Sequence, residues 1–192
     1  NGSGKPSFLN AVTGAVPYEA RSLSVFGEDM TMAAPARMFR AGVSRTFQNL
    51  RLIDELTVEE NVRVGSLLPR ATGVVRSMLR TPRSRREMRQ RVAQAEQALD
   101  RAGILDHRRD VVSRLPYGIR RRVEVARALA SEPRVLLLDE PTAGFGPDES
   151  LEFASMISGL SANAGLSVIV VEHDMAVVRS ACQHVYVLLQ GQ

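Results

Sequence analysis

The sequence predicts an α/β domain with a mainly parallel sheet and an inserted helical subdomain. Two short apolar runs, Arg134–Leu138 and Leu166–Val171, alternate with segments of helical period. Continuous apolar runs of this length are typical of strands that are buried on both faces of a parallel sheet. By contrast, the stretch from Thr72 to Arg114 is almost purely helical in pattern. We therefore expect one domain over residues 1–192, with a helical subdomain inserted at approximately 72–130.

Local patterns along the chain predict the individual elements. Ser7–Val12 is expected to form a short helix, and Ser22–Phe26 alternates like a strand. Thr57 and Glu60 have the spacing of a capping box, which predicts a helix over Thr57–Leu68. The other expected elements are helices at Gly118–Ala130, Asp148–Leu160 and Met175–Ala181, and a last strand at Val185–Leu189.

The stretch Arg70–Arg91 is strongly basic, and an amphipathic helix is predicted to begin after Pro82, where Ser84 and Glu87 have a second capping-box spacing. Apolar residues recur along one face of this helix at three- and four-residue steps, at Met88, Val92, Ala95, Leu99 and Ala102. The arginines could form a patch for nucleic acid or lipid headgroups, or simply the solvated outer face of the helix. The second interpretation is favoured.

Composition restricts the class of protein. A hydrophobic content of 44% and a charged content of 24% are ordinary for a globular protein, and no apolar run approaches the roughly 20 residues that cross a bilayer. Cys182 is the only cysteine, which excludes an internal disulfide and fits a reducing compartment. The net charge of +4 would permit anionic partners, but Lys5 is the only lysine among 25 basic residues. An arginine bias of this kind makes the charge a weak indicator of partners.

The chain opens on NGSGKPSFLN, in which Gly2, Ser3, Gly4 and Lys5 match most of a phosphate-binding loop. Glycines let backbone N–H groups face phosphate oxygens, the following helix offers its positive end, and the lysine reaches the terminal phosphates. Pro6 stands where such loops carry Ser or Thr. Taken alone, these residues would also suit a glycine-rich turn before a helix.

A second motif, RVLLLDEPT, places two carboxylates directly after a buried strand. The carboxyl ends of parallel strands are where α/β sheets bind their ligands. We expect Asp139 to hold Mg²⁺ and Glu140 to polarise the water that attacks the γ-phosphate of ATP. Solvated turn carboxylates are the alternative, and the apolar run before them makes it the weaker one.

Three further motifs complete a family pattern: TFQN at Thr46–Asn49, LPYGIRRRVEVARALA at Leu115–Ala130, and VVEHDM at Val170–Met175. With them in this order, the chain resembles the nucleotide-binding domain of an ABC transporter over nearly its whole length. The resemblance implies a P-loop NTPase fold of ABC type, bound ATP and Mg²⁺, and ATP hydrolysis.

The resemblance also implies roles for particular residues. Gln48 would lie near Mg²⁺ and the attacking water, and His173 would sense the γ-phosphate. The implied ATP-binding residues are Asn1, Gly2, Ser3, Gly4, Lys5, Pro6 and Ser7. A signature segment would contact the ATP of a second subunit through Leu115, Pro116, Tyr117, Gly118 and Ile119.

Finer features suggest the subfamily. The stretch VSRTFQNLRLIDELTVEENVRVG and the LPYG form of the signature resemble ATP-binding subunits of branched-chain amino acid importers. The implied partners are transmembrane permease subunits, a second ATP-binding subunit as homo- or heterodimer and, indirectly, a periplasmic solute-binding protein, without nucleic acid. The implied location is peripheral, on the cytoplasmic face of the inner membrane. Subunits for amides, urea or other polar solutes look alike, so the solute stays open.

Some residues depart from the family pattern. Pro6 removes a hydroxyl that would ligate Mg²⁺ and one backbone N–H, Ile119 and Arg120 replace the usual glutamines, and Gly146 stands where Asp or Asn is usual. We expect bound nucleotide and impaired hydrolysis, or else a weakly catalytic partner in a heterodimer. We also expect the chain to be truncated at both ends, without the strand that feeds the phosphate loop. A soluble ABC protein acting on nucleic acid is a further alternative, prompted by Arg76–Arg91, although such proteins usually carry two ATPase domains.

Overall fold

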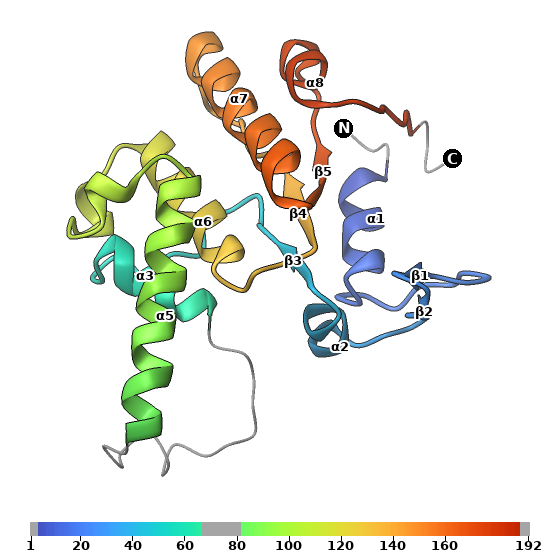
Figure 1. The fold of residues 1–192 in the computed structure, drawn as a ribbon. Helices are drawn as coiled ribbons and strands as arrows, with labels where there is room; N and C mark the ends of the chain where they lie inside the picture. The colour runs from blue at the N-terminus through green and yellow to red at the C-terminus, as the bar shows by residue number, and fades with distance from the viewer. Residues whose placement is uncertain (1–3, 67–81, 189–192) are drawn as a thin grey trace. The chain divides into compact units, whose positions relative to one another are not determined.

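The computed structural model describes residues 4–66 and 82–188, and the chain divides into two compact units (Figure 1). The first unit combines Asn1–Gln48 with Arg134–Gln192, and the second is Asn49–Pro133. The predicted helical subdomain, at approximately 72–130, falls within the range of the second unit. That this unit is an insertion into one ATPase domain remains a prediction.

The first unit is built on a parallel sheet of three strands in the order β3-β4-β5, namely β3 (Val43–Arg45), β4 (Val135–Asp139) and β5 (Ser167–Val171). β4 is the central strand, and because it carries no polar side chain before Asp139, it can be buried on both faces. Leu136, Leu137 and Leu138 are at most 1% exposed. A small antiparallel pair, β1 (Ser24–Val25) and β2 (Glu28–Asp29), lies outside this sheet. The predicted parallel sheet is confirmed.

Helices pack on both sides of this sheet, as Figure 1 shows for α1 and α7. The helices of the unit are α1 (Lys5–Val12), α2 (Pro35–Arg40), α7 (Pro147–Ala164) and α8 (Met175–Ala181). Because side chains alternate along a strand, β4 turns Leu137 to one face and Leu136 and Leu138 to the other. The face with Leu137 belongs to a buried cluster formed by Leu9, Met30, Ala33, Met38, Val43, Leu137 and Val171. This cluster holds α1 against the strands that carry the motif residues.

Three expectations for the first unit need correction. β5 is not buried on both faces: exposed and half-buried residues alternate from Ser167 to Val170, Ile169 is 44% exposed, and only Val171 is buried in this strand. The predicted strand Ser22–Phe26 is only Ser24–Val25. The predicted strand Val185–Leu189 is absent over residues 185–188, where Tyr186 is 92% exposed, and Leu189 lies outside the described residues.

The second unit is helical. Its helices are α3 (Val58–Gly65), α5 (Pro82–Arg101) and α6 (Tyr117–Leu129), with single 3₁₀ turns at η1 (Leu105–His107) and η2 (Val112–Arg114). The predicted capping box at the start of α3 is confirmed, because the Thr57 hydroxyl accepts from the backbone N–H of Glu60 while the Glu60 carboxylate accepts from that of Thr57. The segment before α3 is held by Asn61, which is fully buried and bonded to both backbone groups of Ile53.

The predicted apolar face of α5 is only partly correct. Ala95, Leu99 and Ala102 are buried, Val92 is half-buried, and Met88 is 48% exposed. The helix begins at Pro82, so Ser84 lies inside it and not before its start. Proline suits the first turn of a helix because its ring fixes a helical φ and the N–H that it lacks would have no partner there.

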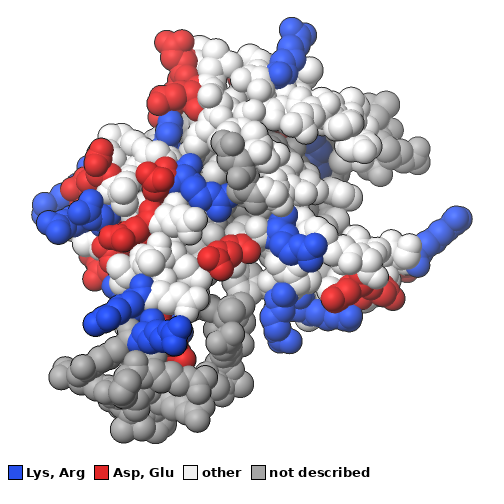
Figure 2. Space-filling view, in the orientation of Figure 1, with Lys and Arg blue, Asp and Glu red and all other residues white. Residues whose placement is uncertain are grey.

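Charge and hydropathy of the described residues are unremarkable. Over residues 4–66 and 82–188, no helix combines the length and apolar character needed to cross a membrane. On the face drawn in Figure 2, Lys and Arg side chains are scattered among Asp and Glu side chains, with uncharged surface between them. Arg86 and Arg89 of α5 are exposed, and most of the basic stretch before them lies outside the described residues.

Candidate functional site

The candidate site lies where the three parallel strands end at one edge of the sheet. In the register of the sheet, Arg45 pairs with Leu137 and Asp139 pairs with Val171, so β3, β4 and β5 finish side by side. The segments that leave these strands carry Gln48, Glu140 and His173. Because the carboxyl ends of parallel strands meet at one edge of a sheet, these three residues follow the same edge.

Lys5 begins α1 and reaches toward the end of β5. Gly4 immediately before it has φ 83°, a left-handed conformation that costs glycine nothing, and no side chain caps the helix. The Lys5 ammonium donates to the backbone carbonyl of Glu172 at 3.3 Å. The lysine therefore lies at the N-terminal end of α1 and at the same edge of the sheet as Val170–Met175, which we call the switch segment.

The other predicted residues of the phosphate loop are only partly described. Asn1, Gly2 and Ser3 lie outside the described residues. Pro6 occupies the first turn of α1, where a proline is tolerated, and Ser7 is exposed. The fold of α1 thus accommodates the departure at Pro6.

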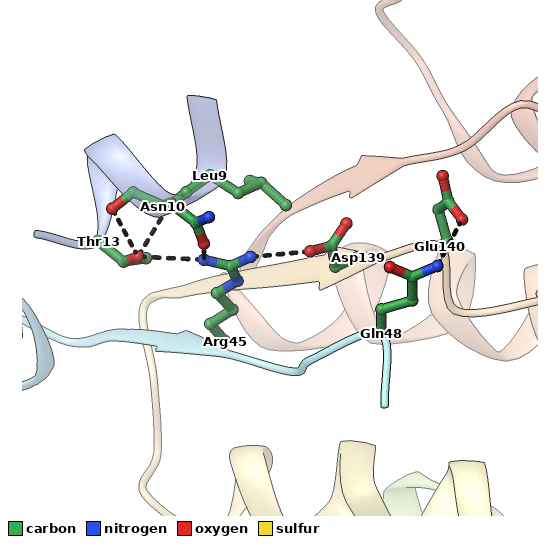
Figure 3. Close-up of polar contacts among 7 residues, drawn as sticks. All are labelled: Leu9, Asn10, Thr13, Arg45, Gln48, Asp139 and Glu140. Atoms are coloured by element: carbon green, nitrogen blue, oxygen red, sulfur yellow. Dashed lines mark hydrogen bonds and ion pairs between the residues drawn. The ribbon is translucent and has the colours of Figure 1, made fainter. Parts of the chain in front are cut away.

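Asp139 is held by an arginine that the sequence analysis did not single out. Arg45 donates to Oδ2 of Asp139 at 2.8 Å, and the two side chains are 8% and 7% exposed (Figure 3). The same guanidinium donates to Oδ1 of Asn10 in α1 at 2.7 Å and to the hydroxyl of Thr13, the C-cap residue of α1, at 3.3 Å. Asp139 is therefore joined through Arg45 to the helix that begins at Lys5.

Glu140 and Gln48 approach each other across the strand ends. The Gln48 amide nitrogen donates to Oε2 of Glu140 at 3.4 Å, and the Gln48 amide oxygen points away from Glu140 (Figure 3). Glu140 has φ 43°, an uncommon conformation for a residue other than glycine and one that is enriched at active sites. Its backbone N–H donates to the carbonyl of Val171 at 2.9 Å, which ties this turn to β5.

A second residue that sequence reasoning missed is Glu172. Its side chain is 1% exposed, and Oε1 accepts from both the N–H and the hydroxyl of Thr142, at 3.1 and 2.7 Å. Oε2 accepts from the N–H of His173 at 3.1 Å, whereas the His173 side chain is 66% exposed. Glu172 therefore joins the turn after Glu140 to the switch segment. Burial and the nearby Glu172 carboxylate raise the pKa of the Cys182 thiol.

The predicted signature residues lie in the second unit, at the start of α6. Pro116 is the N-cap residue, Gly118 is buried, and Tyr117 is 44% exposed. The other two, Leu115 and Ile119, are half-buried. Arg120, which replaces a glutamine, donates to the Asp54 carboxylate at 2.6 Å in the same unit. This ion pair accounts locally for an arginine at that position.

The side-chain oxygen atoms at the strand ends suit Mg²⁺ only in part as ligands. Carboxylate and amide oxygens are ligands that Mg²⁺ accepts, and it is usually held by one or two carboxylates together with substrate phosphates and water. Asp139 and Gln48 offer such oxygens, whereas Pro6 offers none. Among the described residues, no group of three or more His, Cys, Asp or Glu side chains is arranged to hold a metal ion.

Comparisons with known proteins agree with this geometry. Residues 1–143 match the family model described as ABC transporter. The chain is 35% identical over 191 residues to the high-affinity branched-chain amino acid transport ATP-binding protein LivG of Escherichia coli K12, covering all of this chain and 75% of that protein. It is 34% identical, with the same coverage, to the corresponding protein BraF of Pseudomonas aeruginosa.

A solved structure is similar as well. The crystal structure of an ATP-binding cassette of an ABC transporter in its ADP conformation superposes with a TM-score of 0.83 at 28% identity, covering 100% of this chain and 74% of that one. This likeness bears out the predicted P-loop NTPase fold of ABC type. The chain therefore belongs to the ABC transporter family, as an ATP-binding cassette that binds nucleotide and hydrolyses ATP.

Proposed function

We propose that this protein is the ATP-binding subunit of an importer for branched-chain amino acids. The observation that carries the proposal is the 35% identity to LivG over the full chain, which covers three quarters of that relative. By this proposal two ATP-binding subunits, identical or different, associate with transmembrane permease subunits on the cytoplasmic face of the inner membrane. A periplasmic solute-binding protein delivers the amino acid, and no nucleic acid takes part.

Different residues of the first unit are proposed to bind the phosphates of ATP and to hold Mg²⁺. Lys5 and the backbone of the loop from Asn1 to Ser7 bind the phosphates, and this role is supported by the position of the Lys5 ammonium beside Glu172. Asp139 and Gln48 are the residues that would hold Mg²⁺. The chemistry supplied by bound Mg²⁺ is neutralisation of charge on the β- and γ-phosphate oxygens.

Glu140 is proposed as the general base. A carboxylate within hydrogen-bond reach of the attacking water accepts its proton as the bond to the γ-phosphorus forms. The contact with Gln48 supports this role, because it holds the carboxylate at the edge where the phosphates would lie. His173, exposed at the end of β5, would contact the γ-phosphate.

The signature segment, Leu115 to Ile119, is proposed to complete the ATP site of a second subunit. The N-terminus of α6 supports this, because the first backbone N–H groups of a helix have no partners within it and favour an anion. By this proposal the helical unit is inserted into the ATPase core, and hydrolysis is coupled to association of two cassettes.

An uptake assay tests which solute is transported. In cells lacking their own branched-chain uptake, this protein produced with its permease and solute-binding partners should restore ATP-dependent uptake of leucine, isoleucine and valine. A Lys5→Ala variant made at the same level should not, because the phosphate contact is lost. Uptake of urea or an amide in place of these amino acids would assign the protein to a different solute.

A weakly catalytic subunit is the second candidate, and Pro6 is the specific observation that favours it. Pro6→Thr restores a hydroxyl and an N–H at the first turn of α1. If Pro6 limits catalysis, the variant should hydrolyse ATP at least about tenfold faster, a gain of about 1.4 kcal/mol in transition-state stabilisation. An equal rate in both proteins would show that Pro6 is not the limiting defect.

A further inference from the structure

We propose that Arg45 is a positioning residue for ATP hydrolysis, which holds the Asp139 carboxylate in a fixed relation to α1. This inference rests on the proposed function of Asp139 and Lys5. Arg45 touches neither nucleotide nor reacting atoms in this scheme. It acts through Asp139 on one side and through α1, the helix of the phosphate loop, on the other.

One guanidinium makes contacts in both directions. Nη2 bonds to Oδ2 of Asp139 at 2.8 Å, at the end of β4. Nη1 donates to Oδ1 of Asn10 in α1 at 2.7 Å and to the hydroxyl of Thr13, its C-cap residue, at 3.3 Å (Figure 3). A planar guanidinium presents its donors in a fixed fork, so the directions of these contacts are set together.

The surroundings of the guanidinium limit its movement. The Thr13 hydroxyl is itself anchored, since it donates to the carbonyl of Leu9 at 2.7 Å. The Phe47 ring lies against the guanidinium, with its centroid 5.2 Å from Cζ. Arg45 and Asp139 are each more than nine-tenths buried. Arg45 is therefore a rigid bridge between α1 and β4 and not a flexible surface cation.

This bridge connects the two parts of the site that must act on the same phosphates. Lys5 begins α1, and Asp139 ends β4. An ionised carboxylate has lone pairs on both oxygens, so holding Oδ2 still allows Oδ1 to accept from a ligand. Residues that orient a metal-binding carboxylate typically change metal affinity or activity by about 10- to 100-fold when they are replaced.

A competing interpretation predicts the opposite change in Mg²⁺ affinity. If Arg45 served only as a positive charge that keeps cations away from Asp139, removing the charge would strengthen Mg²⁺ binding. If Arg45 positions Asp139, removing either the fork or the charge weakens Mg²⁺ binding. Two substitutions separate these cases: Arg45→Lys keeps the charge and loses the fork, and Arg45→Gln loses the charge.

The readout is the Mg²⁺ dependence of nucleotide binding, measured with trinitrophenyl-ATP fluorescence in a Mg²⁺ titration and again in EDTA. For Arg45→Lys and Arg45→Gln, we expect the half-saturating Mg²⁺ concentration to rise by about 10-fold or more. Binding in EDTA should match that of the unaltered protein, because the phosphate contacts of Lys5 remain. A merely structural role would weaken binding equally with and without Mg²⁺, and that result would overturn the proposal.

Two further variants make the test specific. Asn10→Ala removes the shorter of the two contacts at the helix end of the bridge and keeps the ion pair, so it should shift the Mg²⁺ titration in the same direction by less. Arg37→Lys is the matched control, since Arg37 donates to the Asp29 carbonyl on the exposed surface of the same unit. It should leave the titration unchanged.

The outcomes separate this inference from the proposed function. If the unaltered protein shows no Mg²⁺-dependent nucleotide binding, the proposed function of the site fails. If the unaltered protein binds Mg·ATP and Arg45→Lys gives the same titration, only the positioning role of Arg45 fails. Tighter Mg²⁺ binding by Arg45→Gln would identify the arginine as a competing charge and would also overturn the proposal.

Discussion

Thr142 and Glu172 are joined by two hydrogen bonds, one from the backbone N–H and one from the hydroxyl of the threonine, both to Oε1 of the buried carboxylate. The pair connects the turn after Glu140 to the segment that carries His173. Both segments follow parallel strands, and neither belongs to a helix or strand at this point. The pair therefore adds a side-chain connection to the backbone bond from Glu140 to Val171.

Glu172→Ala should lower the free energy of unfolding by about 3 kcal/mol. The substitution leaves the backbone N–H groups of Thr142 and His173 without their charged acceptor, and each such loss costs about 1–3 kcal/mol. Thr142→Val, which replaces only the hydroxyl by a methyl group, should cost about 1 kcal/mol. Urea unfolding of both variants measures these differences.

Glu19 provides the control for this pair, because it is an exposed glutamate of the same unit. Glu19→Ala should change the free energy of unfolding by no more than about 0.5 kcal/mol. Equal effects of Glu19→Ala and Glu172→Ala would contradict the view that Glu172 joins the two segments.

Asn61→Leu should destabilise the helical unit by about 3 kcal/mol. The fully buried amide accepts from the N–H of Ile53 at 2.8 Å and donates to the carbonyls of Ile53 and Thr57 at 2.9 and 3.1 Å. Leucine branches at Cγ as asparagine does but satisfies none of these groups, and each stranded backbone group costs about 1–3 kcal/mol.

Hydrogen exchange localises the effect of Asn61→Leu, which should increase exchange over α3 and the segment before it. Gln97→Leu, an exposed polar-to-apolar change on α5 of the same unit, is the matched control. If Asn61→Leu exchanged no faster over α3 than this control, the amide would not be what fixes the segment.

The capping box of α3 makes stability depend on pH. The hydrogen bonds from the Thr57 backbone and hydroxyl lower the pKa of the Glu60 carboxyl below its ordinary value of 4.5. A group with a lowered pKa stabilises the folded state above its ordinary pKa, and this contribution is lost as pH falls through the folded pKa. Glu60→Gln should therefore lower stability near neutral pH, and the difference from the unaltered protein should shrink at a strongly acidic pH, as pH falls through the lowered folded pKa.

Urea unfolding at the two pH values measures this dependence. Glu96→Gln, at an exposed position of α5, is the control and should change stability little at either pH. A stability difference between Glu60→Gln and the unaltered protein that is the same at both pH values would contradict the assigned cause.

Periodicity and motif order were sufficient to predict much of the architecture. The apolar run before Asp139 predicted a buried central strand, and the Thr57–Glu60 spacing located the start of a helix, because both signals are local. β3 was missed because its three residues are too short to show alternation. The predicted burial of β5 was wrong because the exposure of its side chains depends on which elements pack on each face of the sheet, and a single apolar run does not specify that.

Sequence motifs located the residues at the strand ends, whereas the residues that hold them through long-range contacts were missed. Asp139 and Glu140 follow an apolar strand, so their position at the sheet edge was predictable. Arg45 meets Asn10 and Asp139 only in the folded chain, at separations of 35 and 94 residues. Glu172 had one local signal, a carboxylate beside His173 directly after an apolar run, which could have identified it as a candidate.

Hydrolysis of Mg·ATP by the purified protein, compared with its Glu140→Gln variant, tests the central claim most directly. Phosphate release and trinitrophenyl-ATP binding are measured on both, with the exposed Glu149→Gln as control. We expect Glu140→Gln to keep nucleotide binding and to lose about 10²- to 10⁴-fold in turnover, as for removal of a general base. Equal phosphate release by the unaltered protein and Glu140→Gln would contradict the account.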